Sequence, residues 1–192
     1  MKSGDQTSPR KRNIKCWAYI VAAVIVKTII TLLFILLIMR IRNPTVRLGG
    51  VIVENLKANS SPSKPSFTMK LNAQVTVKNT NFGHFKFKNS TFMISYQGNP
   101  VGEATIVKAR ARAQSTMKFN VTVSVSSNNK ISGNSPQLSS DIDSGIINLS
   151  SHAKLEGKIH LFKIFKKKKS AEMNCTMDVN TSSRQIQNLT CK

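Results

Sequence analysis

Acidic side chains, histidines and aromatic rings are scarce in this sequence, and each shortage excludes a class of function. The 192-residue chain has 8 Asp and Glu, three His and 6% aromatic residues. None of the histidines, His84, His152 and His160, has a Cys, a His or a carboxylate at the spacing of a metal site. No Gly-x-Ser-x-Gly turn, phosphate-binding glycine loop or pair of catalytic carboxylates is found. We therefore expect no enzyme activity, no metal and no cofactor.

Positive charge is abundant, because 29 Lys and Arg give the chain a formal net charge of +21. A surface this basic attracts polyanions, namely nucleic acid, anionic lipid headgroups or acidic polysaccharide. Nucleic acid is the weakest of these candidates, since the sequence offers no aromatic stacking platform and carries a long apolar segment.

That apolar segment, residues 16–39, predicts a transmembrane helix. It contains 24 residues and a single charge, Lys27. Such a helix spans roughly 36 Å, against about 30 Å for the hydrocarbon core of a bilayer. Burying Lys27 costs on the order of 2.5–3.5 kcal/mol, which is offset by fourteen Ile, Val, Leu and Phe residues at roughly −0.3 to −0.6 kcal/mol each. The run exceeds the apolar core of a signal peptide, about 7–15 residues, and no cleavage site follows, so we expect an uncleaved signal anchor.

The orientation of this helix is close to a tie on charge alone. Basic residues occur in the tail, residues 1–15, and again after the helix at Arg40, Arg42, Arg47 and Lys57. Seven Asn-x-Ser/Thr sequons follow the helix and favour a cytosolic tail with an outer C-terminal domain, although roughly half would arise by chance in this composition. The glycosylation candidates are Asn59, Asn89, Asn120, Asn148, Asn174, Asn180 and Asn188.

The three cysteines give a better indication of topology. Cys16 lies alone at the inner edge of the expected span, where it suits palmitoylation but is more often an ordinary small residue. Cys175 and Cys191 lie in two strand-like runs that flank the turn-rich NTSS, a hairpin whose far ends bring the thiols together. No His or third Cys lies nearby to complete a metal site. We expect a disulfide, which favours an oxidising compartment outside the cytosol.

Beyond the helix, residues 40–66 read as a juxtamembrane strand and a Ser/Pro-rich linker, and residues 67–192 as one β domain. Apolar and polar residues alternate in segments 69–79 and 116–125, as in strands with one buried face. Antiparallel strands of this kind pack face to face, so the expected fold is mainly β, an immunoglobulin- or fibronectin-like β-sandwich.

Two further elements complete the expected domain. Segment 147–165 predicts a long strand region that is broken at Gly157. Segment 135–146 predicts one short helix, in which Asp141 and Asp143 are expected to act as caps.

The segment VTVKNTNFGHFKFKNSTFMISYQGNPVGEATI, residues 75–106, resembles the plant late embryogenesis abundant group 2 domain, also called the water-stress and hypersensitive-response domain. That pattern has a strand, an Asn-Pro-Asn turn, a second strand and an aromatic-x-Gly-x-x-Val/Leu-Gly sequence; Thr80 stands at the proline. The order of parts over about residues 10–192 is similar to the membrane-anchored, hairpin-induced-like branch. Matching positions are Val75, Val77, Asn79, Asn81, Tyr96, Gly98, Val101 and Gly102.

This resemblance implies a β-sandwich with a short helix, no catalytic activity, and a role in pathogen defence or dehydration tolerance at the plasma membrane. Its turn motif here comprises Asn79, Asn81, Gly98 and Gly102. The two asparagines are expected to shape a turn, because their short side chains bond locally and tolerate left-handed backbone.

Two clusters of basic residues in the outer domain are candidate binding sites. Lys108, Arg110 and Arg112 alternate and would share one face of a strand. The second cluster lies in KIFKKKK and comprises Lys163, Lys166, Lys167, Lys168 and Lys169. Solvated surface is the plain alternative for both clusters.

Two functions remain open. One is a non-enzymatic, single-pass membrane protein of plant stress or defence that presents a basic domain to acidic cell-wall polysaccharide, anionic lipid or protein partners, including a second copy. The other is a dehydration-stress protectant that acts at the membrane surface with no specific ligand.

Overall fold

The computed structural model describes residues 9–38, 40–128, 131, 136–161 and 165–192. They form two compact units, one that ends at Arg40 and one that begins at Ile41.

The first unit is helix α1 (Pro9–Ile38), which begins seven residues before the expected span. Its segment Cys16–Leu36 is long and apolar enough to cross a membrane. The hydroxyls of Thr28 and Thr31 donate to backbone carbonyls one turn earlier, each at 2.8 Å. These two polar groups are thus satisfied within the helix, as an apolar surrounding requires.

The second unit contains, in its described part, ten strands and the short helix α2 (Pro136–Asp143). The strands are β1 (Thr45–Asn59), β2 (Ser66–Asn79), β3 (His84–Phe87), β4 (Ser90–Tyr96), β5 (Asn99–Ile106), β6 (Ala109–Ala111), β7 (Ser115–Ser126), β8 (Ile146–Leu161), β9 (Phe165–Asn180) and β10 (Gln185–Cys191).

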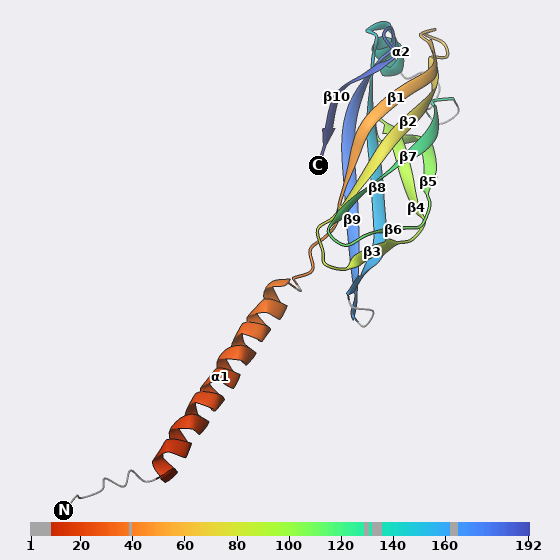
Figure 1. The fold of residues 1–192 in the computed structure, drawn as a ribbon. Helices are drawn as coiled ribbons and strands as arrows, with labels where there is room; N and C mark the ends of the chain where they lie inside the picture. Colours follow the sequence, from red (N-terminus) through yellow and green to blue (C-terminus); the bar gives the residue numbers. More distant parts are fainter. Residues whose placement is uncertain (1–8, 39, 129–130, 132–135, 162–164) are drawn as a thin grey trace, which may run out of the picture. The chain divides into compact units, whose positions relative to one another are not determined.

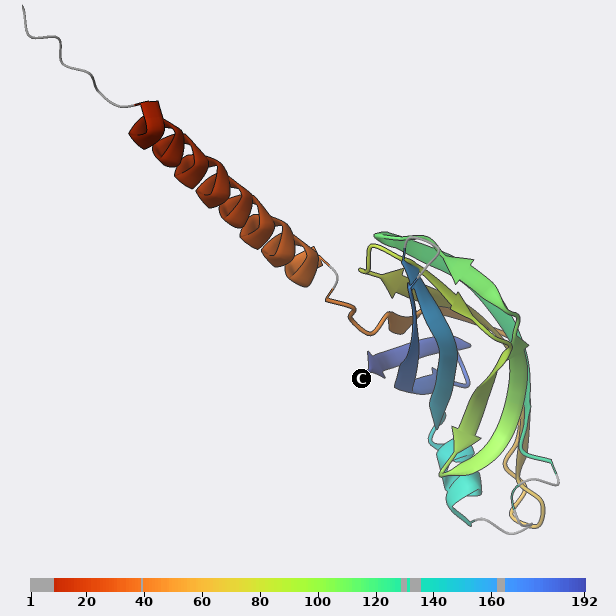
Figure 2. The same ribbon diagram turned by 90° about the horizontal axis from the view of Figure 1, so that it is seen from below.

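Hydrogen bonds join all ten strands in one antiparallel sheet with the order β1-β2-β7-β5-β4-β8. Strand β8 pairs with β9 on one edge, and its other edge is shared by β4 and, further along, by β3. β6 extends the sheet beyond β3, and β10 extends it beyond β9. The sheet curls strongly, so that β1 comes to lie against β9 and β10 and the unit resembles a barrel (Figure 1, Figure 2).

The prediction of mainly antiparallel β structure is confirmed. The two separate sheets expected of a sandwich are not observed, because hydrogen bonds join the described strands in one sheet. Strands β5 and β7 are joined at the pair Gly102–Val125. A Cβ at Gly102 would lie 2.9 Å from the carbonyl oxygen of Ser124, closer than real Cβ atoms come. Glycine therefore lets the two strands touch, and the sheet curls continuously where a larger residue would separate it.

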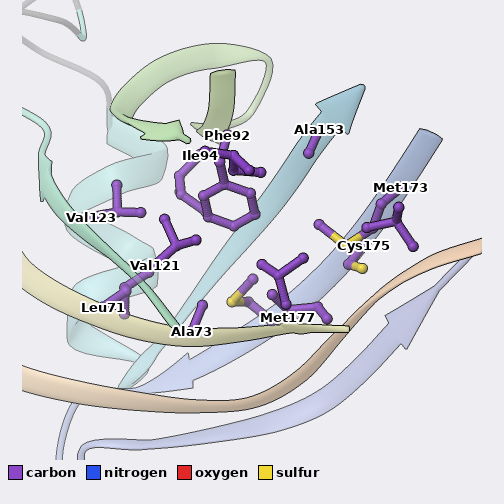
Figure 3. Packing of buried hydrophobic residues seen from close by; sticks show 14 of the residues in the cluster. Leu71, Ala73, Phe92, Ile94, Val121, Val123, Ala153, Met173, Cys175 and Met177 are labelled. Atoms are coloured by element: carbon purple, nitrogen blue, oxygen red, sulfur yellow. The ribbon is translucent and has the colours of Figure 1, made fainter. Parts of the chain in front are cut away.

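The interior is filled by two facing layers of apolar side chains. Side chains of β2 and β7, such as Leu71 and Val123, point toward Phe92 and Ile94 of β4 and toward Met177 of β9 (Figure 3). The predicted alternation in β2 is confirmed, because each of the four residues predicted to face inward is at most 2% exposed. These residues are Leu71, Ala73, Val75 and Val77.

The β unit starts well before the expected boundary at residue 67. Strand β1 pairs with β2 from Thr45–Lys78 to Asn59–Ser66, and its Val46 and Leu48 are buried in the common core. Alternation in β1 is interrupted by two register shifts, so its inward residues do not follow a simple period of two. The segment that was expected to be a juxtamembrane strand is therefore part of the sheet.

Strand β8 runs through Gly157, so the expected break at this glycine is wrong. A Cβ at Gly157 would overlap the carbonyl oxygen of Lys86 and lie 2.7 Å from the ring of Phe85. Glycine is needed here because the neighbouring strand β3 approaches β8 closely at the pair Phe87–Gly157, while β8 remains paired with β9 on its other edge. The predicted short helix is confirmed as α2, which buries Leu138 at one end of the sheet.

Substituting alanine for Gly157 tests this close approach. We expect Gly157→Ala to lower the free energy of unfolding by about 1–3 kcal/mol, because the new methyl group forces β3 away from β8. Gly50→Ala is the matched control, since nothing lies within 4 Å of that position, and its effect should stay within about 0.5 kcal/mol. Urea unfolding of the full chain in detergent, followed by β-sheet circular dichroism, measures both; equal effects would contradict the packing argument.

Candidate anion-binding face

Asn79 and Asn81 tie distant segments together in the interior. Both are at most 4% exposed, and neither has a positive φ. Asn79 Nδ2 donates to the carbonyl oxygens of Gly83 at 2.8 Å and Arg112 at 2.9 Å. Asn81 Oδ1 accepts from the backbone N–H of Arg42 at 2.7 Å, and its Nδ2 donates to the Arg42 carbonyl at 2.9 Å. This network fixes the loop before β3 beside β6 and beside the start of the unit.

Gly98 lies in the turn from β4 to β5, where Gln97 and Gly98 both have positive φ, +46° and +81°. Tyr96, just before this turn, donates its hydroxyl to Asp141 Oδ2 of α2 at 2.7 Å. Burial, and then this hydrogen bond, raise the pKa of Tyr96 above its ordinary value. Asp141 therefore anchors α2 to the core.

The expected disulfide is present between Cys175 and Cys191, with an S–S distance of 2.05 Å. The two residues lie opposite each other in the β9–β10 register. Cys175 is 2% exposed, so the bridge pins the last strand to the buried side of β9. Cys16 is a free, exposed cysteine.

Four basic side chains from four neighbouring strands lie directly opposite one another on the outer face of the sheet. The register pairs Arg110 of β6 with Lys86 of β3, Lys86 with Lys158 of β8, and Lys158 with Lys168 of β9. All four are exposed. Side chains in directly opposed positions have Cβ atoms about 4.5–5.5 Å apart, so these like charges repel one another. We call Arg110, Lys86, Lys158 and Lys168 the cationic ladder.

The adjacent row of the sheet contains two histidines and one lysine. His84 of β3 lies opposite His160 of β8, which lies opposite Lys166 of β9. The Nδ1 atom of His84 accepts a hydrogen bond from the backbone N–H of Ala113 at 3.3 Å. Partial burial, and then the charges of Lys86, Lys166 and Lys158 and the nearby His84, lower the pKa of His160 below its ordinary value.

An open hollow of about 570 Å³ follows the ladder over β3, β8 and β9. Glu156 is the one carboxylate in its lining, against six lysines. One of these, Lys154, forms an ion pair with Glu172 at 2.9 Å, which is the single ion pair among the residues that the structure describes. The lining lysines are Lys86, Lys88, Lys154, Lys158, Lys168 and Lys169.

The two basic clusters predicted from the sequence meet on this face only in part. Arg110 and Lys168 belong to the ladder, and Lys166 to the row beside it. Lys167 and Lys169 pair with Ile159 and Gly157, in rows that alternate with the ladder, so they are not members of it, although Lys169 borders the hollow. Of the remaining members, Lys108 and Arg112 are exposed at the ends of β6, and Lys163 lies outside the described residues.

Lys86 and Lys158 connect the two clusters, and the sequence analysis did not single them out. The alternation in HFKFK, residues 84–88, was the available signal, because it places Lys86 on the polar face of a strand. The sequence holds no signal for the register that brings β6, β3, β8 and β9 side by side.

The seven glycosylation candidates are exposed or half-buried. Asn148 of β8 and Asn188 of β10 both donate their amides to the carboxylate of Asp178, at 2.7 and 2.8 Å. Asn174 lies opposite His152 and contacts its Nδ1 through Oδ1 at 2.6 Å. These sequons and Asn180 occupy the half of the β8–β9–β10 sheet away from the ladder. The other candidates, Asn59, Asn89 and Asn120, lie at the end of β1, just before β4 and on β7.

The chemistry that this face supports is the binding of anions. Its groups are ammonium, guanidinium and imidazole side chains that donate hydrogen bonds and supply positive charge. Among the described residues, no group of three or more His, Cys, Asp or Glu side chains is placed to hold a metal ion. The face is broad and open, as suits contact with an extended anionic surface.

The described part of the chain thus consists of one apolar helix followed by a curled antiparallel β unit with a cationic outer face. This combination is the basis for comparing it with known proteins. The chain belongs to the late embryogenesis abundant protein family, whose model matches residues 74–177. It is 28% identical over 180 residues to the late embryogenesis abundant protein At1g64065 of Arabidopsis thaliana, a match that covers 93% of this chain and 83% of that protein.

Two solved structures show likeness at low sequence identity. The solution structure of AT1g01470 from Arabidopsis thaliana matches with a TM-score of 0.37 and 14% identity, over 71% of this chain and 82% of that one. The solution structure of the late embryogenesis abundant protein At2g46140.1 matches with a TM-score of 0.34 and 11% identity, over 94% and 95%.

Removing the disulfide tests its contribution to the fold. We expect Cys175→Ala/Cys191→Ala to lower the free energy of unfolding by about 3 kcal/mol, because the unfolded chain loses the constraint of the closed loop. Cys16→Ala, which alters a cysteine outside the β unit, should leave unfolding unchanged. Urea unfolding in the absence of reductant compares the three proteins, and a double variant as stable as the parent would contradict the expectation.

The lowered pKa of His160 predicts a pH dependence of stability. The unfolded chain takes up this proton near pH 6.5, whereas the folded chain takes it up only at lower pH. The contribution of neutral His160 to the stability of the folded chain is therefore fully present above about pH 6.5, and it is lost as the pH falls through the lowered pKa. His160→Gln should reduce the loss of stability between about pH 7 and pH 5, when urea unfolding is measured across that range. His152→Gln makes the same change elsewhere on β8. If it has an equal effect, the surroundings of His160 are not the cause of the pH dependence.

Proposed function

We propose that this chain is a non-enzymatic, single-pass membrane protein of plant stress or defence responses, of the hairpin-induced-like branch of its family. Helix α1 anchors it in the plasma membrane, with residues 1–15 in the cytosol. The β unit lies outside the cytosol and presents its basic surface to polyanionic or protein partners, including a second copy of the chain.

The observation that carries this proposal is the disulfide between Cys175 and Cys191, in a unit that follows an apolar helix directly. Disulfides form and persist in oxidising compartments and are rare in the cytosol. Because the charges that flank the helix nearly balance, the disulfide is the stronger argument for an outer β unit. The sequons on its exposed surface are consistent with this side.

The distribution of charge favours an interaction module over a protectant without a ligand. From Arg40 onward the chain has 23 basic and 7 acidic residues. A protectant acting in bulk has no need for basic residues at matching positions on adjacent strands. The cationic ladder instead gathers them on one face, where their fields add.

Deglycosylation of the native protein in isolated membranes tests the topology. We expect endoglycosidase to increase its electrophoretic mobility. We also expect reductant to shift a band of the parent but not of Cys175→Ser/Cys191→Ser, because only the parent holds the bridge. Protease added to sealed membranes should spare the β unit when only the cytosolic side is exposed.

The protease result decides between the two orientations, because sequons can remain unused. If protease cleaves the β unit from the cytosolic side, and the chain carries neither glycan nor disulfide, the orientation is the reverse of the one proposed. Release of the chain by alkaline carbonate would show that α1 is not an anchor.

A further inference from the structure

We propose that the cationic ladder binds a linear polyuronate, an acidic polysaccharide with one carboxylate on each sugar ring, laid across β6, β3, β8 and β9. This inference rests on the proposed function, because it takes the β unit to lie outside the cytosol, and it names the class of polyanion that the basic surface binds. The site consists of the ladder and the open hollow that follows it.

The ladder is a row of cations that crosses the strands, so its charges recur at the distance between neighbouring strands. Three successive pairings connect its four members. Neighbouring strands lie about 4.8 Å apart, so the row extends over about 14 Å. The carboxylates of a polyuronate also recur along a line, once for each ring. A chain that crosses the strands can therefore bring a carboxylate to each cation in turn.

The fold itself leaves the charge of the ladder without compensation. Each of its pairings sets Lys or Arg opposite Lys, an arrangement that destabilises a sheet. The single ion pair in the described part of the chain joins Lys154 to Glu172, two rows away along β8. A line of carboxylates would supply the missing negative charge to all four cations.

One acidic residue on this face favours a sugar polymer over a polyanion that lacks hydroxyl groups. Glu156 is exposed, borders the hollow and lies in the row next to the ladder, opposite Ser170. Its carboxylate repels the phosphates of a nucleic acid or the carboxylates of an acidic peptide, but it accepts hydrogen bonds from hydroxyl groups. A polyuronate carries hydroxyl groups between its carboxylates. An acceptor beside a row of cations therefore matches its chemistry.

The row beside the ladder adds a charge that depends on pH. The charged and titratable groups around His160 are Lys158 on its own strand, His84 and Lys86 of β3, and Lys166 of β9. Partial burial and these neighbours lower the pKa of His160 in the free protein. Bound carboxylates act in the opposite direction, because they favour the protonated imidazole. Binding should therefore tighten as the pH falls from about 7 to about 5.5, where carboxylates with a pKa near that of Asp, about 3.9, remain ionised.

Titration of the full chain with oligomers of galacturonic acid tests the binding. The protein is held in phosphatidylcholine nanodiscs, and the probe is an oligogalacturonate of one defined length. The matched control is the same oligomer with methyl-esterified carboxyl groups, which keeps the ring hydroxyls and loses the charges. We expect calorimetry to show saturable binding of the acid and none of the ester, weaker binding at high salt, and weaker binding of polyglutamate with the same number of charges.

Two triple variants with the same change in charge separate the ladder from the overall net charge. Lys86→Gln/Lys158→Gln/Lys168→Gln removes three members of the ladder. An exposed ion pair contributes up to about fivefold, so the affinity for the acid should fall by on the order of tenfold. This variant loses like-charge pairs and should fold at least as stably as the parent, which urea unfolding checks.

Lys57→Gln/Lys64→Gln/Lys70→Gln is the control for net charge. These exposed lysines lie toward the β1–β2 connection, away from the ladder. This variant should bind the acid within about twofold of the parent, because long-range interactions between exposed charges are screened by salt.

His160→Gln tests the position of the polymer beside the ladder. The affinity of the parent should rise between about pH 7 and about pH 5.5, by up to about tenfold for each unit by which binding raises the pKa of His160. The variant should lose this rise, whereas His152→Gln should keep it. An affinity of the parent that does not change with pH would contradict the placement of the polymer beside His160.

Binding of the acid but not the ester, weakened only in the ladder variant, supports the proposal. Equal loss of affinity in the two triple variants would overturn it, since net charge alone would then account for the binding. If polyglutamate binds as tightly as the acid, the face recognises charge without hydroxyl groups, and the polysaccharide is rejected. The protease assay reports the orientation separately: a chain that binds no oligogalacturonate, with its β unit protected from cytosolic protease, rejects this inference and leaves the proposed function standing.

Discussion

The pairing of β8 with β9 is the constraint on which the rest of the β unit depends. Its register runs without a shift from Ile146–Asn180 to Leu161–Phe165. One edge of this hairpin receives β4 and β3, and the other receives β10, which the disulfide holds. Because successive side chains point to opposite faces, this one register buries Ile159 and exposes Lys158. A slip by one residue would turn the lysines inward, so burial of the apolar residues fixes the position of the charges.

The unit tolerates the cationic ladder because its interior is strongly apolar. Repulsion between opposed like charges costs about 0.2–1 kcal/mol for each pair. Each fully buried large apolar side chain contributes about 1.5–3 kcal/mol, and β2, β4, β8 and β9 supply many of them. The buried amides of Asn79 and Asn81 are satisfied by backbone partners, so they add specificity without leaving unpaired polar groups. The core thus outweighs the repulsion on the surface, which remains available to an anionic partner.

Sequence periodicity predicted the elements better than their arrangement. Alternation located β2 and β7, because it has a regular period. Turn residues located the turn at Gly98 and the cysteine hairpin, because these depend on local contacts. The two-sheet sandwich is not confirmed, because one close approach, at Gly102 and Val125, joins the halves. Gly157 was taken for a break because nothing in the sequence indicates that β3 pairs with β8 there and approaches it closely. Half of the ladder was found as basic runs, whereas Lys86 and Lys158 needed the register.

The sequence by itself determined the apolar helix, the β character of the remaining chain, the pairing of its last two cysteines and the excess of positive charge. These depend on composition, on a period of two residues and on a short hairpin. Only the tertiary structure decided where the charge gathers: Arg110, Lys86, Lys158 and Lys168 are far apart in the chain and become neighbours through three strand pairings. The physical reason is that strand register is set by burial of the opposite face, and burial is a property of the whole sheet.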